Sequence, residues 1–591
     1  MSDYQPPLEE IQFALQHIAG LDSIAQLPGY QEASSDTCAA ILEEAAKFAS
    51  TVLAPLNYTG DAEGVNLRDD KVVTPKGFPD AYRQFAEGGW NSVAFDPEFG
   101  GQGMPWALTT ALQEIWNAAN MAFALCPLLT QGAIEALQIH GSAEQKAKYL
   151  APLIAGRWTG TMNLTEPQAG SDLGALKTKA EPAGDHYRIT GQKIFITYGD
   201  HDMAENIIHF VLARLPDAPA GSKGISLFIV PKFLVNDDGS IGTRNDLHAV
   251  ALERKLGIHA SPTCVMAYGD QGGATGYLVG EANRGLEYMF IMMNNARLAV
   301  GVQGLAIADR ALQAARSYAG ERLQGTPPGH EAKERLPIRY HPDIRRNLMT
   351  MRAWTEATRC LIYFTAGTLD CAKRHPDADE RVAYQALVDL LIPIAKAWST
   401  DRGVTVASIG LQIHGGAGFI EETGVAQYYR DARIAPIYEG TNGIQAIDLL
   451  GRKVLRDGGR AARHLIADMT TTTAGLEGSS NADIGQLAVN LKTAIAGLER
   501  ATEHLLNLGR NDMSEALAGA TPYLDLFGLT LGGWLLAKSA VVAQETRHPL
   551  AAAKQAMAHF YMTNLLPQAT AQELAVVEGA ASTLALAPED L

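Results

Sequence analysis

Hydrophobic residues recur along this chain at two different spacings, and the spacing changes twice. Up to about residue 155 the spacing is helical. In residues 38–56, one helix face collects Ile41, Leu42, Ala45, Phe48 and Val52. Pro55 is expected to end this helix, and residues 105–124 predict a further one. We therefore predict a helical domain over residues 1–157.

The middle of the chain has a different pattern. Short β-branched runs at 207–212 and 225–230 are separated by segments rich in Pro, Gly, Ser and Asp, and residues 186–197 alternate around Gly191. Several short strands joined by turns are typical of an antiparallel sheet rather than of βαβ units. The pattern predicts a β domain over residues 158–283.

Helical spacing returns at Leu286 and continues to about Leu455, which predicts a helical bundle over residues 284–456. Gly458-Gly459 and the four threonines at 470–473 then predict a hinge. The remaining sequence is rich in Ala and Leu, and it predicts a helical extension over residues 457–591. The predicted fold class is therefore α+β and multidomain.

Composition narrows the possible functions. The 591 residues are 47% hydrophobic and 19% charged, as in a globular chain, and the formal net charge is −17. Because phosphate binding needs clustered positive charge, no nucleic-acid partner is expected. The sequence has no HExxH or comparable metal spacing, no GxxxxGK[ST] loop and no convincing Rossmann glycine motif, so neither a metal nor a Rossmann site is expected.

Cysteine usage and the N-terminal residues favour a cytoplasmic protein. The cysteines lie scattered, without CxxC spacing, at Cys38, Cys126, Cys264, Cys360 and Cys371, and we expect reduced, mostly buried thiols. The first residues lack the basic and apolar regions of a signal peptide. The most apolar stretch, Leu526–Ala537, is shorter than the roughly 20 residues of a membrane span, so a buried helix without stable membrane insertion is expected.

Two segments of the predicted β domain carry groups that could serve a ligand site. In residues 164–172, Thr165 and Ser171 offer hydroxyl groups and Gly170 permits close approach to the backbone, although an ordinary Ser/Asp turn would read the same. In residues 193–199, Phe195 and Thr197 share a strand face, an aromatic surface beside a hydroxyl; plain core packing is the alternative.

A third segment, residues 437–443, lies between two helical segments and contains Glu439. Apolar neighbours and Gly440 would leave this carboxylate partly desolvated, which raises the pKa of a carboxylic acid and makes its anion a better base. The alternative is a solvated loop glutamate beside a Thr N-cap, here Thr441.

Together and in this order, these segments resemble the acyl-CoA dehydrogenase flavoprotein family. The similarity covers roughly residues 35–455. It is carried by FDPEFGG at 95–101, TEPQAGSD at 165–172, GQKIFIT at 191–197, Arg297, Glu321-Arg322, QIHGG at 412–416, RDAR at 430–433 and IYEGTN at 437–442.

The resemblance implies a helical N-terminal domain, a middle β domain and a C-terminal four-helix bundle, with FAD as the cofactor. It implies α,β-dehydrogenation of an acyl-CoA thioester to the trans-2-enoyl-CoA. Glu439 would take the α-proton while the β-hydride passes to flavin N5 on the opposite side of the acyl chain. The thioester carbonyl would be polarised by the main-chain N–H of the base and a flavin ribityl hydroxyl.

Roles for further residues are implied by the same resemblance. The residues expected to contact FAD are Leu164, Thr165, Ser171, Phe195, Thr197 and Thr441, with Arg322, Gln412 and Gly416 reaching the ADP part from a neighbouring subunit. Arg297, Asn294 and Gly440 are the candidates for substrate binding.

The sequence departs from the family at three places. Ala296 stands where some members carry their base, which favours Glu439. Residues 323–329 lack an aromatic that is common in the family, and residues 340–343 replace the usual His-Gln, which puts the cross-subunit FAD contacts there in doubt.

The tail after residue 456 resembles an extended subgroup that includes dehydrogenases of 3-methylthiopropanoyl-CoA. We therefore expect that substrate, with short- or medium-chain straight acyl-CoA as the alternative. A tail of this kind would cover the surface through which shorter members form tetramers, so a homodimer is expected, with electron-transferring flavoprotein as acceptor. An acyl-CoA oxidase and a DNA-associated relative are the less favoured alternatives, the latter because the tail mixes acidic and basic residues.

Overall fold

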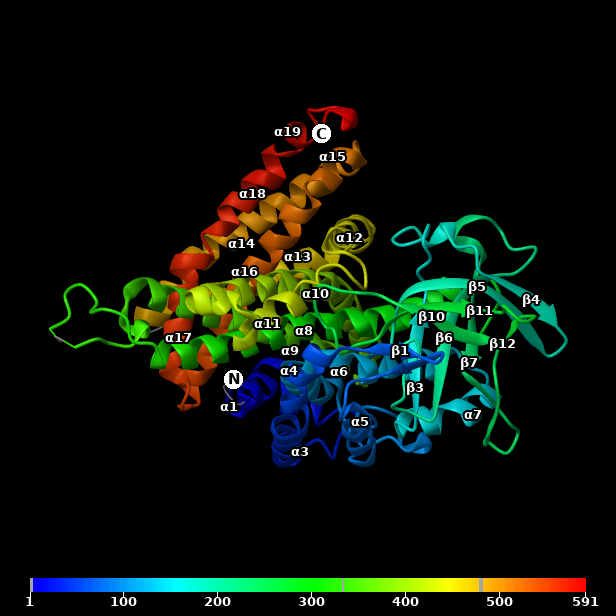
Figure 1. Cartoon of the computed structure of the whole chain (residues 1–591). Coiled ribbons are helices and arrows are strands. Elements are labelled where there is room, and N and C mark those ends of the chain that lie inside the picture. The colour runs from blue at the N-terminus through cyan, green and yellow to red at the C-terminus, as the bar shows by residue number, and fades with distance from the viewer. Residues whose placement is uncertain (1–3, 332–333, 478–481) are drawn as a thin grey trace. The chain divides into compact units, whose positions relative to one another are not determined.

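The computed structural model describes residues 4–331, 334–477 and 482–591 (Figure 1). The chain divides into two compact units, a coarser division than the four predicted domains. We call the first the helical unit; it comprises Met1–Ala46, Trp106–Ala118 and Val300–Leu591. The second, the mixed unit, comprises Lys47–Pro105 and Ala119–Ala299.

The mixed unit is built on a sheet with the strand order β10-β11-β5-β12-β7-β6-β3, in which β4 also pairs with β5 and β6. Its strands are β3 (Trp158–Asn163), β4 (Lys179–Ala183), β5 (His186–Thr197), β6 (Asn206–Arg214), β7 (Ile225–Pro231), β10 (Leu247–Leu252), β11 (Thr263–Tyr268) and β12 (Ala274–Leu278). Two short hairpins are β1 (Asn66–Arg68) with β2 (Lys71–Val73), and β8 (Phe233–Val235) with β9 (Ile241–Arg244).

The predicted antiparallel sheet is confirmed except at β6, with which β3 pairs in parallel along its whole length and β4 pairs in parallel through Lys179 and Arg214. All six residues of β3 are buried, and so are the first eight of β6. Strands buried on both faces are typical of parallel pairing, whereas a strand with one solvated face alternates. Parallel pairing here is therefore consistent with the burial of both strands.

Helices complete the mixed unit. They are α4 (Ala54–Glu63), α5 (Phe78–Glu87), α7 (Ala143–Ile154), the three-residue turn η3 (Pro97–Phe99), and the parts of α6 (Trp106–His140) and α8 (Gly285–Glu321) that lie between residues 119 and 299. The prediction that Pro55 ends a helix is wrong. From α3 (Ser35–Phe48) the backbone continues through the π-helical turn η2 (Ala49–Leu53) into α4, where Pro55 lies in the first turn. Proline is tolerated there because the π-helical turn before it interrupts the regular hydrogen-bond ladder of the α-helix.

The helical unit contains a bundle in which α9 (Pro342–Arg374) packs along α10 (Ala378–Ile413). The part of α8 after Val300 lies very close to α10 at three glycines. A Cβ added at Gly304 would lie 2.5 Å from the carbonyl oxygen of Ser399, and one at Gly403 would lie 2.7 Å from that of Gly304. Only glycine permits this backbone-to-backbone approach, which Gly301 continues toward Ala395.

The remaining elements of the helical unit flank this bundle (Figure 1). Before it come α1 (Leu8–Phe13), η1 (Ala14–Ala19), α2 (Leu21–Ile24) and most of α3. Between α8 and α9 lies η6 (Ile338–Tyr340). After α10 come η7 (Gly415–Phe419), η8 (Glu421–Thr423), α11 (Val425–Ala432), α12 (Asn442–Asp448) and η9 (Leu449–Leu455). The C-terminal extension comprises α13 (Arg460–Glu477), α14 (Ala482–Leu508), α15 (Met513–Ala518), α16 (Ala520–Glu545), α17 (Ala551–Phe560), η10 (Tyr561–Leu565), α18 (Gln568–Glu578), α19 (Ala580–Thr583) and η11 (Pro588–Asp590).

Within the extension, the predicted helical character is confirmed but the predicted threonine hinge is wrong. Thr470–Thr473 lie inside α13, and each hydroxyl donates to the carbonyl four residues earlier. These back-bonds satisfy the hydroxyl groups without breaking the helix. The Gly458-Gly459 pair does form a turn, with φ of 69° and 80°.

Two helices of the described residues, α6 and α16, are long and apolar enough to cross a membrane by length and composition. The most apolar windows of α6 and α16 are 89% and 83% buried within the protein, as in the core helices of a globular fold. The apolar stretch Leu526–Ala537 lies in α16, so the expected buried helix is confirmed. There Gly528 and Gly532 pack against the indole of Trp398 on α10.

A cluster of buried charges joins five elements of the helical unit. Arg359 on α9 is 2% exposed and contacts Glu114, Glu356 and Asp309 at 2.8, 3.0 and 3.3 Å. Lys554 on α17 of the extension is 1% exposed and contacts Glu356 as well as Glu10 on α1. Buried charges are tolerated when each is paired, and this cluster ties the extension and the N-terminal helix to the bundle.

Candidate functional site

The predicted site residues divide between the two units. In the mixed unit, the loop of residues 164–172 begins where β3 ends and is folded on itself, with the main-chain N–H groups of Glu166 and Ala169 donating to each other's carbonyl oxygens at 3.0 and 2.9 Å. The N–H of Ile194 on β5 donates to the carbonyl of Thr165 at 2.9 Å. The structure therefore brings the loop and the segment of Phe195 together.

A buried ion pair holds this loop. Lys193 on β5 is fully buried, and its Nζ lies 2.9 Å from the carbonyl oxygen of Leu164 and 2.8 Å from the Glu166 carboxylate. Burial would raise the pKa of Glu166, but the Lys193 charge and hydrogen bonds from Lys193, Thr178 and the Lys177 N–H lower that pKa to about 2. Burial lowers the pKa of Lys193 to about 8, against the opposing effect of Glu166. At neutral pH both groups are charged, and Leu164 and Thr165 are fixed beside them.

Phe195 does not pack in the core. It occupies a bulge where β5 places an extra residue opposite β11, its φ is 60°, and its side chain is 58% exposed. The next residue, Ile196, is 2% exposed and points to the core, while Thr197 is half-buried. A left-handed backbone at a bulky residue is strained, and bulges often redirect a side chain at a functional site. The exposed ring supports the ligand interpretation over core packing.

The end of the loop is open. Ser171 is exposed, and a Cβ added at Gly170 would meet no atom within 4 Å. Asp172 caps the short turn η4 (Leu173–Ala175), accepting a hydrogen bond from the Gly174 N–H at 3.0 Å. Space beside Gly170 and a free approach to Ser171 fit a phosphate group, whose oxygens accept hydrogen bonds.

Two of the predicted substrate residues also lie in the mixed unit, on α8. Asn294 is exposed and accepts a hydrogen bond at 3.3 Å from Arg297, which is 4% exposed. The Arg297 guanidinium lies 5.9 Å from the ring centre of Phe290. Ala296 is 2% exposed, and its methyl side chain offers no polar group at this position.

In the helical unit, Glu439 is half-buried and lies in the turn before α12. Its φ is 55° and that of Gly440 is 85°, two successive left-handed residues. Thr441 is the N-cap of α12, and its Oγ1 accepts from the Ile444 N–H at 3.3 Å. The cap considered as an alternative is therefore present, but the glutamate beside it has a strained backbone, which ordinary solvated loops do not need.

The three residues expected to reach a neighbouring subunit lie at adjacent helix ends of the helical unit. Tyr318 near the end of α8 stacks on His414 at the end of α10, with ring centres 4.4 Å apart. Arg322 follows Tyr318 along the chain and Gln412 precedes His414, and both Arg322 and Gln412 are exposed. Gly416 is exposed, and no atom would lie within 4 Å of an added Cβ.

Large apolar side chains are exposed on the same helix ends: Leu323, Tyr340, Phe419 and Ile420 are 50, 43, 83 and 52% exposed. Leu323 and Tyr340 lie in the two segments that depart from the family's pattern, which are joined by a bridge between Leu323 and Pro337. Large exposed apolar side chains such as these are candidates for an interaction surface.

Four models of one family match consecutive parts of the chain. They describe the acyl-CoA dehydrogenase N-terminal domain (residues 35–157), the middle domain (161–270), the C-terminal domain (283–455) and an acetyl-CoA dehydrogenase C-terminal-like domain (465–587).

Individual proteins match over nearly the full length. The chain is 52% identical over 542 residues to the 3-methylmercaptopropionyl-CoA dehydrogenase of Ruegeria pomeroyi, covering 92% of this chain and 91% of that protein. It is 34% identical to a broad-specificity linear acyl-CoA dehydrogenase of Mycobacterium tuberculosis, covering 96% and 97%. A solved acyl-CoA dehydrogenase from Bacillus anthracis shares the fold at 20% identity, with a TM-score of 0.75 over 97% of this chain and 93% of that one.

The fold and these matches define a flavin-dependent oxidoreductase. The chain belongs to the acyl-CoA dehydrogenase family, so it is an enzyme that oxidises acyl-CoA thioesters with FAD as its cofactor. The residues present fit that cofactor: Phe195 offers an exposed ring for a flat ligand, and the backbone at Gly170 and Gly416 is open to a close approach.

Sequence reasoning missed the residues that hold the two loops. No role was predicted for Glu166 in residues 165–172 or for Lys193 in residues 191–197. Lys396, whose Nζ donates to the Gly440 carbonyl beside Glu439, was not predicted either. A signal did exist for Lys396. It is the single charged residue in the apolar run 390–398, where a lysine is costly to bury unless it serves other groups.

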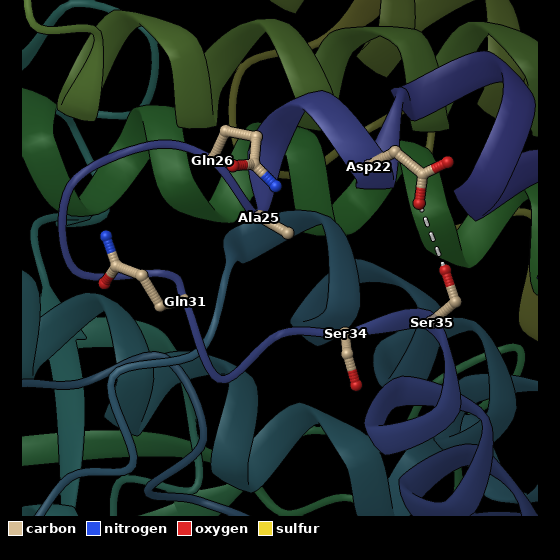
Figure 2. A pocket seen from close by; sticks show the side chains of 6 residues that line it. All are labelled: Asp22, Ala25, Gln26, Gln31, Ser34 and Ser35. Carbon is tan, nitrogen blue, oxygen red and sulfur yellow. Dashed lines mark hydrogen bonds between the residues drawn. The ribbon is translucent and has the colours of Figure 1, made fainter.

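A surface hollow of the helical unit is unrelated to these residues. Figure 2 shows it lined by Asp22, Ala25, Gln26, Gln31, Ser34 and Ser35. The Ser35 hydroxyl donates to Asp22 at 3.3 Å and to Gln16 at 2.8 Å. The lining is polar and already hydrogen-bonded, and none of the predicted site residues belongs to it.

Proposed function

We propose that the acyl-CoA substrate is 3-methylthiopropanoyl-CoA and that the product is 3-methylthioacryloyl-CoA. The observation that supports this is the 52% identity to a dehydrogenase of that name, which extends over 92% of the chain and includes most of the extension. A straight short- or medium-chain acyl-CoA is the second candidate. It is favoured by the 34% identity to a broad-specificity linear acyl-CoA dehydrogenase and to a butyryl-CoA dehydrogenase.

Glu439 is the proposed base, and it takes the proton from the α-carbon of the thioester. The Glu439 side chain is held by a strained turn, an arrangement typical of residues whose orientation matters for the reaction. FAD, when bound, supplies the acceptor for the hydride that leaves the β-carbon. The main-chain N–H of Glu439 is the proposed donor to the thioester carbonyl, whose polarisation makes the α-proton more acidic.

The residues proposed to contact FAD come from both units. In the mixed unit, Leu164 and Thr165 would bind the flavin edge, Ser171 the diphosphate, and Phe195 with Thr197 the isoalloxazine ring. In the helical unit, Thr441 follows the base, and Arg322, Gln412 and Gly416 would bind the ADP part for a neighbouring subunit. Asn294, Arg297 and Gly440 are the proposed substrate contacts.

We also propose a homodimer, a cytoplasmic location and electron-transferring flavoprotein as the electron acceptor. The apolar side chains exposed beside Arg322 and Gly416 support an interface between copies of the chain. Light scattering that gives a tetramer would contradict the dimer. Rapid oxygen consumption without an added acceptor would contradict the flavoprotein acceptor and would favour an oxidase.

The deciding experiment combines a variant with a substrate panel. In Glu439→Gln, a neutral amide cannot accept the proton, so turnover is expected to fall by at least about two to three decades while FAD stays bound. The wild type should be most active on 3-methylthiopropanoyl-CoA, measured by kcat/KM with an artificial acceptor against butanoyl- and octanoyl-CoA. Retained turnover in Glu439→Gln would remove the base assignment, and a higher kcat/KM for butanoyl-CoA would select the straight-chain substrate.

A further inference from the structure

The turn that contains Glu439 has a backbone conformation that it would not adopt unaided. Glu439 has a left-handed φ of 55°, which brings its Cβ close to the following carbonyl oxygen and is unfavourable relative to the right-handed regions. Such conformations persist only where the surrounding structure imposes them. The groups that impose it here can be named from their hydrogen bonds, and all of them belong to the helical unit.

Lys396 holds Gly440, the second of the two left-handed residues. It lies on α10 and is fully buried, and its Nζ donates to the carbonyl oxygen of Gly440 at 2.8 Å. A second donation goes to Oδ1 of Asn442, also at 2.8 Å. A buried ammonium is expensive to desolvate, and these oxygen acceptors offset that cost while fixing the main chain directly after Glu439.

Asn442 makes the position of the ammonium specific. Its Nδ2 donates to the Ala397 carbonyl at 3.1 Å, to Thr400 Oγ1 at 3.0 Å and to Asp401 Oδ1 at 2.8 Å. With three acceptors on its nitrogen side, the amide must present its oxygen to Lys396. The first residue of α12 is thereby tied to α10.

Gln445 completes the set from one turn further along α12. It is fully buried, and its Nε2 donates to the carbonyl oxygen of Glu439 itself at 3.1 Å. On the other side of the turn, the Tyr438 hydroxyl donates to Gln303 on α8. Each residue from Tyr438 to Gly440 therefore has one group held by a buried polar side chain.

We propose that Lys396 is a positioning residue for the base: together with Asn442 and Gln445 it holds the Glu439 turn in its left-handed form and so aims the carboxylate. This inference rests on the proposed function of Glu439. Without the ammonium, the Gly440 carbonyl keeps only the longer hydrogen bond from the Gln445 amide, at 3.4 Å, and the turn relaxes toward an unstrained φ. The carboxylate then moves by an ångström or more, a displacement that can cost about 100-fold in rate.

The test uses holoenzyme of Lys396→Met, which keeps most of the side-chain volume but not the charge. We expect kcat to fall about 10- to 100-fold with KM changed less than about threefold, because the carboxylate acts in the transition state rather than in binding. The isotope effect on flavin reduction with α-dideuterated 3-methylthiopropanoyl-CoA should rise. Lys396→Arg, which can again donate to both oxygens, should recover part of kcat.

The control is Lys538→Met. Lys538 is a half-buried lysine of the helical unit, and its ammonium lies over the rings of Trp534 and Phe364, at 4.6 and 5.8 Å from their centres. Its replacement should leave kcat and the isotope effect unchanged. Hydrogen–deuterium exchange supplies a readout without turnover: the peptide over 437–445 should exchange faster in Lys396→Met and at the wild-type rate in Lys538→Met.

The outcomes separate this inference from the proposed function. If Glu439→Gln keeps its turnover, the base assignment fails. If Glu439→Gln loses turnover while FAD-loaded Lys396→Met keeps the wild-type kcat and exchange rate, only the positioning role is overturned. Should Lys396→Met fail to fold, Gln445→Met decides, because it removes the hydrogen bonds to the Glu439 and Gly440 carbonyls without leaving a buried charge. A several-fold loss of kcat supports the inference, and an unchanged kcat overturns it.

Discussion

The mixed unit and the helical unit solve one problem with the same residue type and different partners. In each unit a fully buried lysine donates to a main-chain carbonyl in a loop of the candidate site: Lys193 to Leu164, and Lys396 to Gly440. The second partner of Lys193 is the carboxylate of Glu166, whereas that of Lys396 is the amide of Asn442. The charges of the two lysines therefore do not explain the choice of partner.

The surroundings of each partner explain it. Glu166 receives only donors: besides Lys193, these are the N–H groups of Lys177 and Thr178, the Thr178 hydroxyl and the Gln168 amide. Asn442 must also donate, to Thr400, Asp401 and a carbonyl. A carboxylate is an acceptor alone, so it suits the first site, and an amide suits the second because it is donor and acceptor at once.

The largest expected effect breaks the ion pair. Lys193→Met leaves the Glu166 carboxylate buried without its cation, and we expect the free energy of unfolding to fall by about 3–5 kcal/mol. Urea unfolding followed by circular dichroism measures this. The double variant Lys193→Met with Glu166→Gln should recover a large part of the loss, and a double variant no more stable than the single one would show that the pair is not coupled in this way.

The next effect sharpens the comparison by exchanging the partner types. Asn442→Asp offers Lys396 a carboxylate, but it removes the donor to Thr400 and faces Asp401, so we expect a loss of about 2–3 kcal/mol. Thermal unfolding should show it. A variant as stable as the wild type would mean that the lysine alone selects its partner.

In the mixed unit, mild acid should lower stability through two buried histidines and not through the Lys193–Glu166 ion pair. Burial, aided by the Lys232 charge, lowers the pKa of His201 and of His209 to about 3. The unfolded chain therefore binds the extra protons, and stability falls as the pH drops below about 6.5, while Glu166, with a pKa of about 2, stays ionised.

Between pH 6.5 and 5.5 each histidine should cost about 1 kcal/mol of the free energy of unfolding. Urea unfolding midpoints at the two pH values measure the change. In His209→Asn, which cannot take up the proton, the pH dependence should shrink by that share. An undiminished pH dependence would assign the loss to other groups.

The smallest effect concerns the extension near the Glu439 turn. Asp525 on α16 pairs with Arg402 at 2.8 Å, and Arg402 follows Asp401, which accepts the bond from Asn442. Asp525→Asn should lower stability by no more than about 1 kcal/mol, because both side chains are partly solvated. A change in kcat of the same order as that of Lys396→Met would give the extension a larger role in the Glu439 turn than this pair implies.

Much of the fold could be predicted from the sequence because hydrophobic spacing is local. The β-branched run at 207–212 and the helical spacing after Leu286 predicted the element types correctly. Such local patterns failed where the surrounding structure decides. Pro55 could begin a helix as well as end one, and Thr470–Thr473 satisfy their hydroxyl groups within α13. The parallel pairing of β3 depends on which strand lies beside it, which no local pattern contains.

The sequence predicted the residues that are proposed to contact ligands, and not the residues that hold their loops in place. Glu439 and Phe195 stand in short recognisable segments, whereas Lys396 and the Glu439 turn are separated by more than forty residues of sequence. Glu166 and Lys193 lie in the segments 165–172 and 191–197, but they pair only because the fold places β5 beside the loop. Contacts between distant segments are a property of the fold.

The contact of Lys554 with Glu10 and Glu356 has a consequence for the order in which the protein is made. The two carboxylates leave the ribosome hundreds of residues before the ammonium that neutralises them. Until α17 has been synthesised, the Lys554 ammonium is missing, and packing of the earlier helices would bury the Glu10 and Glu356 carboxylates without this cation. A chain truncated before α17 should therefore depend on chaperones. It should also be degraded faster than the loss of the packing of the missing helices alone would cause.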